Sequence, residues 1–301
     1  MWKRILKGLA LVLLLGVLGA SAIACEKVRA FDASMSHVYD VPVSTLVRSS
    51  DPAVIARGGH LAASLGECVL CHGENLAGGR VEPMGPLGRI VIPNITTGRD
   101  GRGSRYSDGE LARLVQHGIR RDGTSVRLMP SQNTAWWSDE DVVALISWIR
   151  ARPPVDGDPG VVELSPFAKV LDRIDSIPID VARRIEHAAV RRPPPPAPDA
   201  RYGELVGTAC RGCHGPTLSG GPIPGAPPGL AVPLNLTPHE SGLAAWTFED
   251  FEAFGRTGRR KDGRVVDPFM PVQPLANLDD VERRALWAYL RSVPPRAFGG
   301  R

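Results

Sequence analysis

The pentapeptide Cys-x-x-Cys-His occurs twice in this chain of 301 residues, at positions 68–72 and 210–214. The spacing restricts the local structure strongly, because residues at i, i+3 and i+4 lie on one face of a helix. From one face, two thiols can reach the two vinyl groups of a porphyrin while the imidazole reaches its iron. Cys-x-x-Cys-His is the attachment signature of c-type haem, so we predict two covalently attached haems. Their thioether bonds would come from Cys68, Cys71, Cys210 and Cys213.

Each haem iron needs two axial ligands, and the sequence offers a matching pair for both. The motifs supply the proximal ligands, Nε2 of His72 and of His214. A Met-Pro pair follows each motif at almost the same separation, with Met129 after His72 and Met270 after His214. A residue before proline is pushed out of the helical region, which suits an extended loop across the far haem face. We predict Met129 and Met270 as the distal ligands, and His/Met ligation favours electron transfer over oxygen chemistry.

The two motifs belong to a duplicated unit, because five landmarks of the first half recur in the second at a nearly constant offset. They are the haem motif, Asn94 and Thr96 with Asn235 and Thr237, Asp122-Gly123 with Asp262-Gly263, the two Met-Pro pairs, and Pro153-Pro154 with Pro294-Pro295. A constant offset through so many points indicates two copies of one fold. A length of 301 residues also allows two domains, each with a small core that its haem would complete.

These landmarks set the predicted domain boundaries. We expect a signal or anchor segment at 1–25, an N-terminal extension at 26–55, domain 1 at 56–154, a linker at 155–199 and domain 2 at 200–301. The linker contains the run Pro193 to Pro196, which should be extended at about 3 Å per residue. The linker either separates the domains as a spacer or folds back against both.

Local patterns predict several helices and one strand. Residues 56–66 form a predicted helix that leads into the first motif. Ser107 with Glu110, and Asp279 with Glu282, have the form of capping boxes, and Ser138 is placed to cap the last helix of domain 1. Residues 38–43 alternate like a short strand.

The segment 1–25 has the layout of a secretory signal. Three basic residues among the first seven precede an uncharged, mostly aliphatic run at 8–24. At about 1.5 Å per residue this run spans roughly 26 Å, at the short end for a membrane helix. Three outcomes stay open: lipid attachment at Cys25, cleavage near Ala22, and an uncleaved membrane anchor.

Composition excludes some classes of function. The net charge of +4 is too mild to indicate a nucleic acid partner. Four of the five cysteines lie in the two motifs and only Cys25 remains, so no disulfide framework is implied. Haem attachment of this kind belongs to a compartment outside the cytoplasm.

Each ligand prediction has alternatives. Paired Cys-x-x-Cys motifs also form zinc sites, but here each pair has its own adjacent histidine and distant Met-Pro. A thioredoxin-like redox pair would need a βαβ setting, and strand-like runs are scarce. His117 and His239 are the other possible iron ligands, yet neither has a counterpart in the other repeat.

Arginines are frequent in the loops of both repeats. They are either ordinary solvated charge or a set that surrounds the haem edges and steers an acidic partner. The residues concerned are Arg99, Arg102, Arg105, Arg120 and Arg121 in the first repeat, and Arg256, Arg259, Arg260 and Lys261 in the second.

Taken together, the haem motifs, the Asn-x-Thr loops at 94 and 235 and the Met-Pro pairs at 129 and 270 resemble those of a di-haem c-type cytochrome with two class I cytochrome c domains. The resemblance covers residues 56–154 and 200–295. Such chains are similar to cytochrome subunits of bacterial membrane-bound dehydrogenases and to free periplasmic electron carriers. The dehydrogenase subunits commonly carry three haems, whereas this chain has two motifs.

The resemblance implies an all-α fold, with three to five helices around each haem and one haem edge exposed. The expected architecture is two tandem class I cytochrome c domains joined by a Pro-rich linker. The family often places a tyrosine eight residues before the first motif cysteine; Tyr202 matches, and His60 occupies that position in domain 1. The family also orients the proximal histidine with a proline carbonyl, for which Pro93 and Pro233 are the candidates.

The predicted function is outer-sphere electron transfer, without catalytic residues of its own. The expected partners are redox proteins such as a dehydrogenase subunit or a terminal oxidase, together with the membrane through the N-terminal segment or a lipid. The expected location is the periplasmic side of the inner membrane, or the soluble periplasm if the signal is cleaved without lipidation. The alternative is a di-haem redox enzyme such as a peroxidase, which needs an open axial position where both repeats offer methionine.

Overall fold

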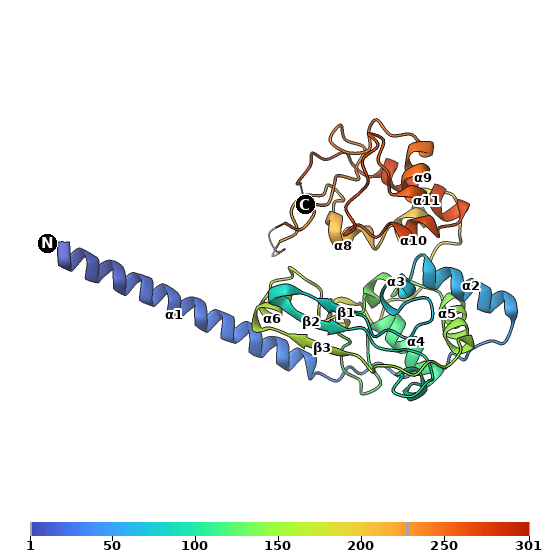
Figure 1. Ribbon diagram of the computed structural model, residues 1–301, viewed down its shortest axis with the longest axis horizontal. Coiled ribbons are helices and arrows are strands. Elements are labelled where there is room, and N and C mark those ends of the chain that lie inside the picture. The colour runs from blue at the N-terminus through green and yellow to red at the C-terminus, as the bar shows by residue number, and fades with distance from the viewer. Residues whose placement is uncertain (1, 225, 227–228, 301) are drawn as a thin grey trace.

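The computed structural model describes residues 2–224, 226 and 229–300 and contains two lobes and a long N-terminal helix that projects from the first lobe (Figure 1). Besides four short 3-10 helices, the helices and strands in the described residues are α1 (Trp2–Met35), α2 (Pro52–Ala63), α3 (Cys68–His72), β1 (Val81–Pro83), β2 (Gly88–Val91), α4 (Asp108–His117), α5 (Asp139–Ala151), β3 (Val161–Leu164), α6 (Pro166–Arg173), α7 (Ala200–Val206), α8 (Cys210–His214), α9 (Phe248–Thr257), α10 (Val272–Ala276) and α11 (Asp280–Ser292). The prediction of an all-α fold is confirmed in that the structure is mostly helical, and it missed one small sheet.

That sheet is antiparallel, in the order β1-β2-β3. β1 pairs with β2 so that Val81 faces Val91, and β2 pairs with β3 so that Gly88 faces Leu164. The third strand comes from the predicted linker, and the linker therefore folds back onto domain 1 instead of running freely. Later in the linker, the Ser176 hydroxyl donates to the Pro224 carbonyl in the second lobe, so the segment contacts both domains.

Each lobe is built on a pair of closely packed helices, α2 with α5 and α7 with α11. A glycine permits the close approach in both. A Cβ atom added to Gly58 would lie 1.9 Å from the Ala144 carbonyl oxygen, and one added to Gly203 would lie 1.9 Å from the Ala285 carbonyl oxygen. No side chain fits at such a distance, so the backbones themselves are in contact. The repeat is therefore reproduced at the level of helix packing.

This packing corrects one alignment made from the sequence. Gly58 stands ten residues before Cys68, whereas Gly203 stands seven residues before Cys210, so domain 1 has three additional residues between these points. Tyr202, one residue before its glycine, is thus equivalent in packing to Arg57. His60 does not take the tyrosine position, because a count back from the motif cysteine ignores the insertion.

The predicted helix starts are confirmed. Ser107 and Glu110 form a complete capping box on α4, and the Ser138 hydroxyl accepts from the Asp141 N–H on α5. Asp279 forms the corresponding box with Glu282 on α11. Short polar side chains in these positions satisfy the N–H groups that the first helical turn leaves without partners.

The apolar faces of the last helices are also buried as the spacing predicts. In α5 they belong to one core cluster with α2 and α4, and in α11 to a second cluster with α7 and α9. The buried residues are Val142, Leu145, Ile146 and Ile149 in the first lobe and Leu286, Tyr289 and Leu290 in the second.

The Asn-x-Thr loops tie the end of each domain to its centre. In both lobes the asparagine amide and the threonine hydroxyl donate to one carbonyl just after the proline pair, that of Val155 or of Arg296. The distances are 2.6 and 3.0 Å from Asn94 and Thr96 to Val155 O, and 2.7 and 3.1 Å from Asn235 and Thr237 to Arg296 O. These hydrogen bonds explain why the Asn-x-Thr loop and the proline pair recur at the same offset.

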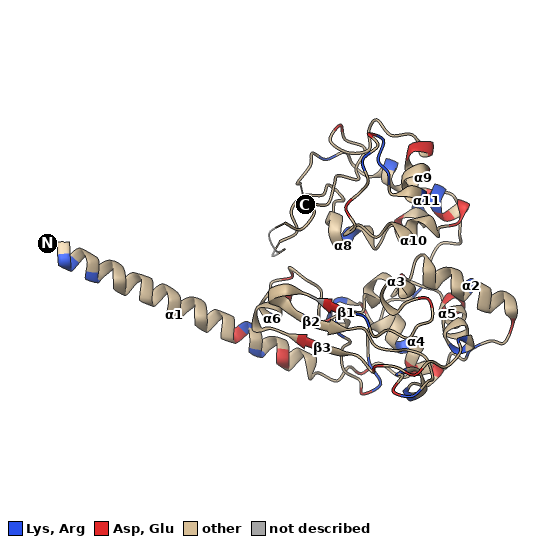
Figure 2. Cartoon of the chain, viewed as in Figure 1, with Lys and Arg blue, Asp and Glu red and all other residues tan. Residues whose placement is uncertain are grey.

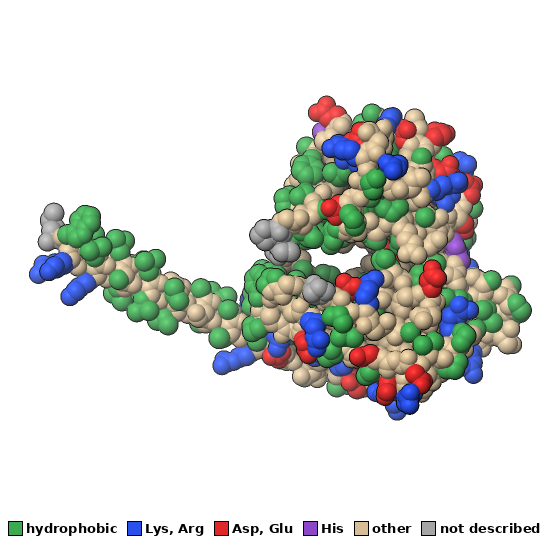
Figure 3. Space-filling view, viewed as in Figure 1, with side chains coloured by type: hydrophobic (Ala, Val, Ile, Leu, Met, Phe, Trp, Pro, Cys, Tyr) green, Lys and Arg blue, Asp and Glu red, His purple; other side chains and the backbone are tan. Residues whose placement is uncertain are grey.

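Helix α1 runs through residue 25 without a break, so the predicted segment boundary lies inside one helix. Its apolar part is exposed along its length, and the helix carries charge only toward its two ends (Figures 2 and 3). By length and composition it is the one helix in the described residues that is suited to cross a membrane. Its last turns join the first lobe, where Phe31 and Met35 are buried in a cluster with Ala168 and Ile179.

The strand predicted at 38–43 is not formed. This segment has no regular secondary structure and is held instead by single hydrogen bonds, from the Tyr39 N–H to the Gly123 carbonyl and from Arg113 to the Val41 carbonyl. Alternation alone does not make a strand, because a strand also needs a neighbour to pair with.

We predict that Gly203→Ala lowers the free energy of unfolding of domain 2 by about 1–3 kcal/mol, because the new methyl group overlaps the Ala285 carbonyl. Gly255→Ala in α9 is the matched control, since its Cβ would make only ordinary contacts 3.7 Å from Leu275. There the helix should gain up to about 1 kcal/mol. Denaturant unfolding of the full-length protein measures both, and equal stability of the two variants would contradict the close helix contact.

Candidate haem sites

The candidate attachment residues lie on two short helices, α3 and α8, which each consist of the five motif residues. A single helical turn is enough to place both cysteines and the histidine on one side. Each helix ends at a glycine with positive φ, Gly73 at 77° and Gly215 at 82°. Only glycine takes this conformation without steric cost, and it turns the chain sharply away after the histidine.

The imidazole of each motif histidine is oriented by a backbone carbonyl. His72 Nδ1 lies 2.9 Å from the Pro93 carbonyl oxygen, as predicted, and His214 Nδ1 lies 2.6 Å from that of Leu234. A carbonyl only accepts, so Nδ1 carries the proton and Nε2 presents its lone pair. The prediction of Pro233 is wrong by one residue. The offset that relates Asn94 to Asn235 makes Leu234 the counterpart of Pro93.

A glycine allows each of these carbonyls to come close. Gly78 and Gly220 have φ values of +59° and +70°, and a Cβ on either would lie 2.4–2.5 Å from the carbonyl oxygen that faces the histidine. Positions 78 and 220 therefore favour glycine for two reasons. The backbone there is left-handed, and a side chain would occupy the space of the carbonyl that accepts from the histidine.

In the second lobe, the predicted ligands face one cavity of about 340 Å³. Its lining includes Cys213 and His214 from the motif, Met270 from the loop before α10, and the aromatic residues Trp246 and Phe251. Met270 ends a short turn in which its N–H donates to the Asp267 carbonyl at 2.9 Å. The cavity is mostly apolar, with a thioether and an imidazole on its wall, and this donor set suits a haem.

In the first lobe, the predicted ligands are distributed around the main core. Met129 packs against the core cluster that also contacts Cys68 and Val69 of the motif. It lies two residues after Arg127, whose bridge to Asp180 anchors its loop to the linker. Met129 and the start of the motif helix therefore pack against the same core cluster.

Burial sets the ionisation of the motif residues. It raises the pKa of Cys68 and of Cys210 to about 12, so both are thiols at neutral pH. Burial also lowers the pKa of His72, against the opposing effect of its bond to Pro93. The imidazole is therefore neutral, which is the form that binds a metal.

The two alternative iron ligands have other partners. His117 Nδ1 lies 3.1 Å from His187 Nδ1 and is contacted by Arg191. Burial lowers the pKa of His117 to about 4, and the charge of Arg191 acts in the same direction. His239 Nδ1 lies 2.9 Å from the Ser241 hydroxyl.

Four of the loop arginines gather at one open pocket of the first lobe. Arg102, Arg105, Arg120 and Arg121 line it together with Tyr106 and Asp122. Burial lowers the pKa of Arg102, and the nearby charges of Arg120 and Arg105 lower it further. The guanidinium groups in this pocket therefore repel one another. The sequence predicted the residues of this set but not which of them meet.

Comparison with known proteins assigns both lobes. Residues 203–294 match the family described as "Cytochrome c", and residues 53–149 match the family described as "Cytochrome C oxidase, cbb3-type, subunit III". Each match covers the helix pair and the candidate haem site of one lobe.

Relatives with similarity along most of the chain carry related descriptions. The chain is 28% identical over 290 residues to the fructose dehydrogenase cytochrome subunit of Gluconobacter japonicus, covering 88% of this chain and 58% of the relative. It is 26% identical over 275 residues to the alcohol dehydrogenase (quinone) cytochrome c subunit of Gluconacetobacter polyoxogenes, covering 82% and 57%. It is 28% identical over 277 residues to the gluconate 2-dehydrogenase cytochrome c subunit of Pantoea cypripedii, covering 81% and 60%. The chain therefore spans little more than half the length of these relatives.

Proposed function

Because the chain contains two cytochrome c domains, we propose that it is a di-haem electron-transfer protein. The observation that carries this proposal is the cavity of domain 2, on whose wall His214 and Met270 both lie. The iron of each haem supplies a one-electron change between the ferric and ferrous states. Two strong axial ligands leave no position for a substrate, and this favours a carrier over an enzyme.

In this proposal Cys68 and Cys71 attach one haem, and Cys210 and Cys213 attach the other. His72 and His214 are the proximal ligands, and Met129 and Met270 the distal ones. The carbonyls of Pro93 and Leu234 support it, because a hydrogen bond to Nδ1 fixes the ring orientation and raises the basicity of Nε2. The apolar walls exclude water and hold the ligands in place. The peroxidase alternative finds no support in the relatives described above.

The two attachment helices lie near each other, and we propose that the domains act as a relay. Leu65, three residues before Cys68, packs against the core of the second lobe. Glu67 is close enough to Cys210 that its charge contributes, after burial, to the raised pKa of that thiol. The segments that lead into both motifs therefore meet at the contact between the lobes.

We propose a dehydrogenase subunit as the electron donor, with a terminal oxidase or another redox protein as the acceptor. The descriptions of the relatives support this choice of donor. The arginine-lined pocket of domain 1 supports an acidic partner surface, because such a patch attracts opposite charge.

We further propose that the protein is held at the periplasmic side of the inner membrane by an uncleaved α1. The continuity of α1 through residue 25 and its apolar composition support this choice, and the burial of Phe31 and Met35 fixes the end of the helix to the first lobe. A helix of 34 residues at about 1.5 Å per residue is roughly 51 Å long, which exceeds the hydrocarbon core of about 30 Å.

We predict that Met129→His and Met270→His each remove about one half of the weak ferric absorption band that reports methionine–iron bonds, because each site contributes one of two His/Met centres. Each variant should also lower the potential of one haem only, by on the order of a tenth of a volt or more within the about 0.8 V range that axial ligands set. Ferric spectra and potentiometric titration test this. The proposal fails if the wild-type protein carries fewer than two haems by mass or lacks the band.

We predict that Gly220→Ala raises the potential of the domain 2 haem, because displacing the Leu234 carbonyl weakens the hydrogen bond to His214 and makes the imidazole a poorer donor. A bond of about 0.5–1.5 kcal/mol corresponds to roughly 20–65 mV for one electron. Gly263→Ala is the control, since Gly263 has a similar φ of +80° but nothing within 4 Å of its Cβ position. Equal potentials in the two variants would exclude the orienting role.

We predict that Cys25→Ser leaves the protein in the membrane fraction with its full N-terminal mass, because α1 itself is the anchor. Fractionation and mass analysis of the mature protein measure this. Release of the variant into the soluble fraction would assign the attachment to a lipid at Cys25 instead.

A further inference from the structure

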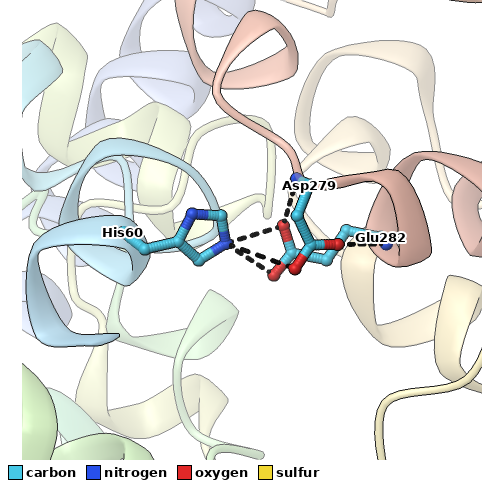
Figure 4. Close-up of side chains that lie close together, drawn as sticks. All are labelled: His60, Asp279 and Glu282. Carbon is cyan, nitrogen blue, oxygen red and sulfur yellow. Dashed lines mark hydrogen bonds and ion pairs between the residues drawn. The ribbon is translucent and has the colours of Figure 1, made fainter. Parts of the chain in front are cut away.

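A cluster of charged side chains joins the two lobes (Figure 4). His60 on α2 points toward the start of α11, and its Nε2 lies 2.9 Å from both carboxylate oxygens of Glu282. The Asp279 carboxylate is 4.0 Å away, and Arg57 Nη1 lies 3.7 Å from Glu282 Oε1. The Asn277 amide donates to the Ala63 carbonyl beside this cluster. The two lobes are therefore joined by hydrogen bonds between particular residues of α2 and of α11 or the segment that leads into it.

The contact relates equivalent parts of the two repeats. Arg57 and Tyr202 each stand one residue before the helix-packing glycine, and Arg57 lies beside the Tyr202 hydroxyl. Asp141 and Glu282 each stand at the third position of the last helix, and Arg57 contacts both, at 3.1 and 3.7 Å. Equivalent residues that meet one another are the mark of a two-fold interface. The domains thus dock approximately as the two halves of a symmetric dimer do.

His60 breaks this symmetry. By the packing alignment its equivalent in domain 2 is Leu205, which stands two residues after Gly203 as His60 does after Gly58 and carries no charge. Only one of the two symmetric positions therefore holds a titratable group, and it faces a carboxylate that is only 1% exposed. A buried carboxylate of this kind needs compensating charge to remain ionised.

The surroundings of His60 favour its protonated form. The hydrogen bond to Glu282 is the largest influence and raises its pKa, while burial opposes this. Glu282 and Asp279 add further attraction from α11 and its cap, and Arg57 on the same helix adds repulsion. Arg57 in turn forms an ion pair with Asp141 of α5, and it also interacts with Tyr202 of α7. The Ser64 hydroxyl, at 3.5 Å, is the remaining polar neighbour that the structure records.

The side chains of His60, Asp279 and Glu282 also have the composition of a metal site, since their possible ligand atoms lie within 4.8 Å of one another. Two observations favour a proton instead. Arg57 already places a fixed positive charge beside Glu282, and both carboxylates are engaged by backbone N–H groups in the capping box of α11.

We propose that His60 is a positioning residue whose imidazolium, paired with Glu282, holds the two haem domains in their docked arrangement, and that loss of its proton releases them. The inference rests on the proposed electron transfer for its functional meaning, although the docking itself does not depend on it. His60 thereby makes the geometry between the two domains sensitive to pH.

The direction follows from the raised pKa. The contact is fully present below the ordinary histidine pKa of about 6.5 and is lost as the pH rises through the raised value of the docked state. Between these two values, the ratio of docked to undocked protein should fall about tenfold per pH unit.

The test uses oxidised full-length protein in detergent, with both haems attached. Pulsed electron paramagnetic resonance gives the distribution of the distance between the two irons, independent of any electron transfer. We expect one narrow distribution at about pH 6 and a second, broad component at about pH 9, with a midpoint above about 6.5. The rate of electron equilibration between the haems should fall along the same curve.

Two variants and one control separate this role from a merely structural one. His60→Gln keeps a hydrogen-bond donor without charge and should show the broad component at every pH. Glu282→Gln keeps the capping acceptor of α11 and should also lose the titration. His37→Gln, at an exposed histidine in the first lobe, should titrate as the wild type does.

A wild-type distance distribution that does not change with pH would overturn the proposal, as would a His60→Gln variant that still titrates. A protein without two haem irons would give no distance signal at all. That result would refute the proposed function and is distinguishable from a failure of the docking proposal.

Discussion

The structure depends on one contact that occurs twice, the approach of the last helix of each domain to the helix before its haem motif. At Gly58 and Gly203 there is room for hydrogen only, and the facing carbonyl of an alanine fills the remaining space. Because α2 and α7 precede the motif helices α3 and α8, this contact anchors the segment that leads to the candidate attachment cysteines in each domain. It also sets the position of the first turn of α5 and α11, whose acidic residues reach the surface where the domains meet.

Backbone carbonyls position the motif histidines and the Asn-x-Thr loops. One carbonyl after each proline pair receives the asparagine and threonine of the Asn-x-Thr loop, and one carbonyl before that loop receives the motif histidine. Backbone acceptors keep their place when side chains change, so the same arrangement persists in two repeats with few identical residues. The glycines at 78 and 220 belong to this arrangement because they leave space for the acceptors.

The two domains differ mainly where they meet the rest of the chain. Domain 1 is extended by the sheet that the linker completes and by the end of α1, so the linker and the last turns of α1 are both part of its surface. Domain 2 contacts domain 1 through α7, α10 and α11, in an interface that pairs equivalent residues. Duplication explains the symmetry of this interface, and the single histidine at position 60 explains how it could respond to pH.

The sequence alone determined the cofactor class, the duplication, the helix caps and the buried faces of the last helices. These features depend on spacing along one helix or on side chains that act within a few residues, and such relations are visible in the chain itself. The sequence could not reveal the pairing of β2 with β3, the packing equivalence of Arg57 with Tyr202, or the contact of His60 with Glu282. Those depend on segments up to 222 residues apart and on a three-residue insertion that only helix packing reveals. Which residues meet across such distances is decided by the three-dimensional path of the chain, because contacts between remote segments carry no periodic signal.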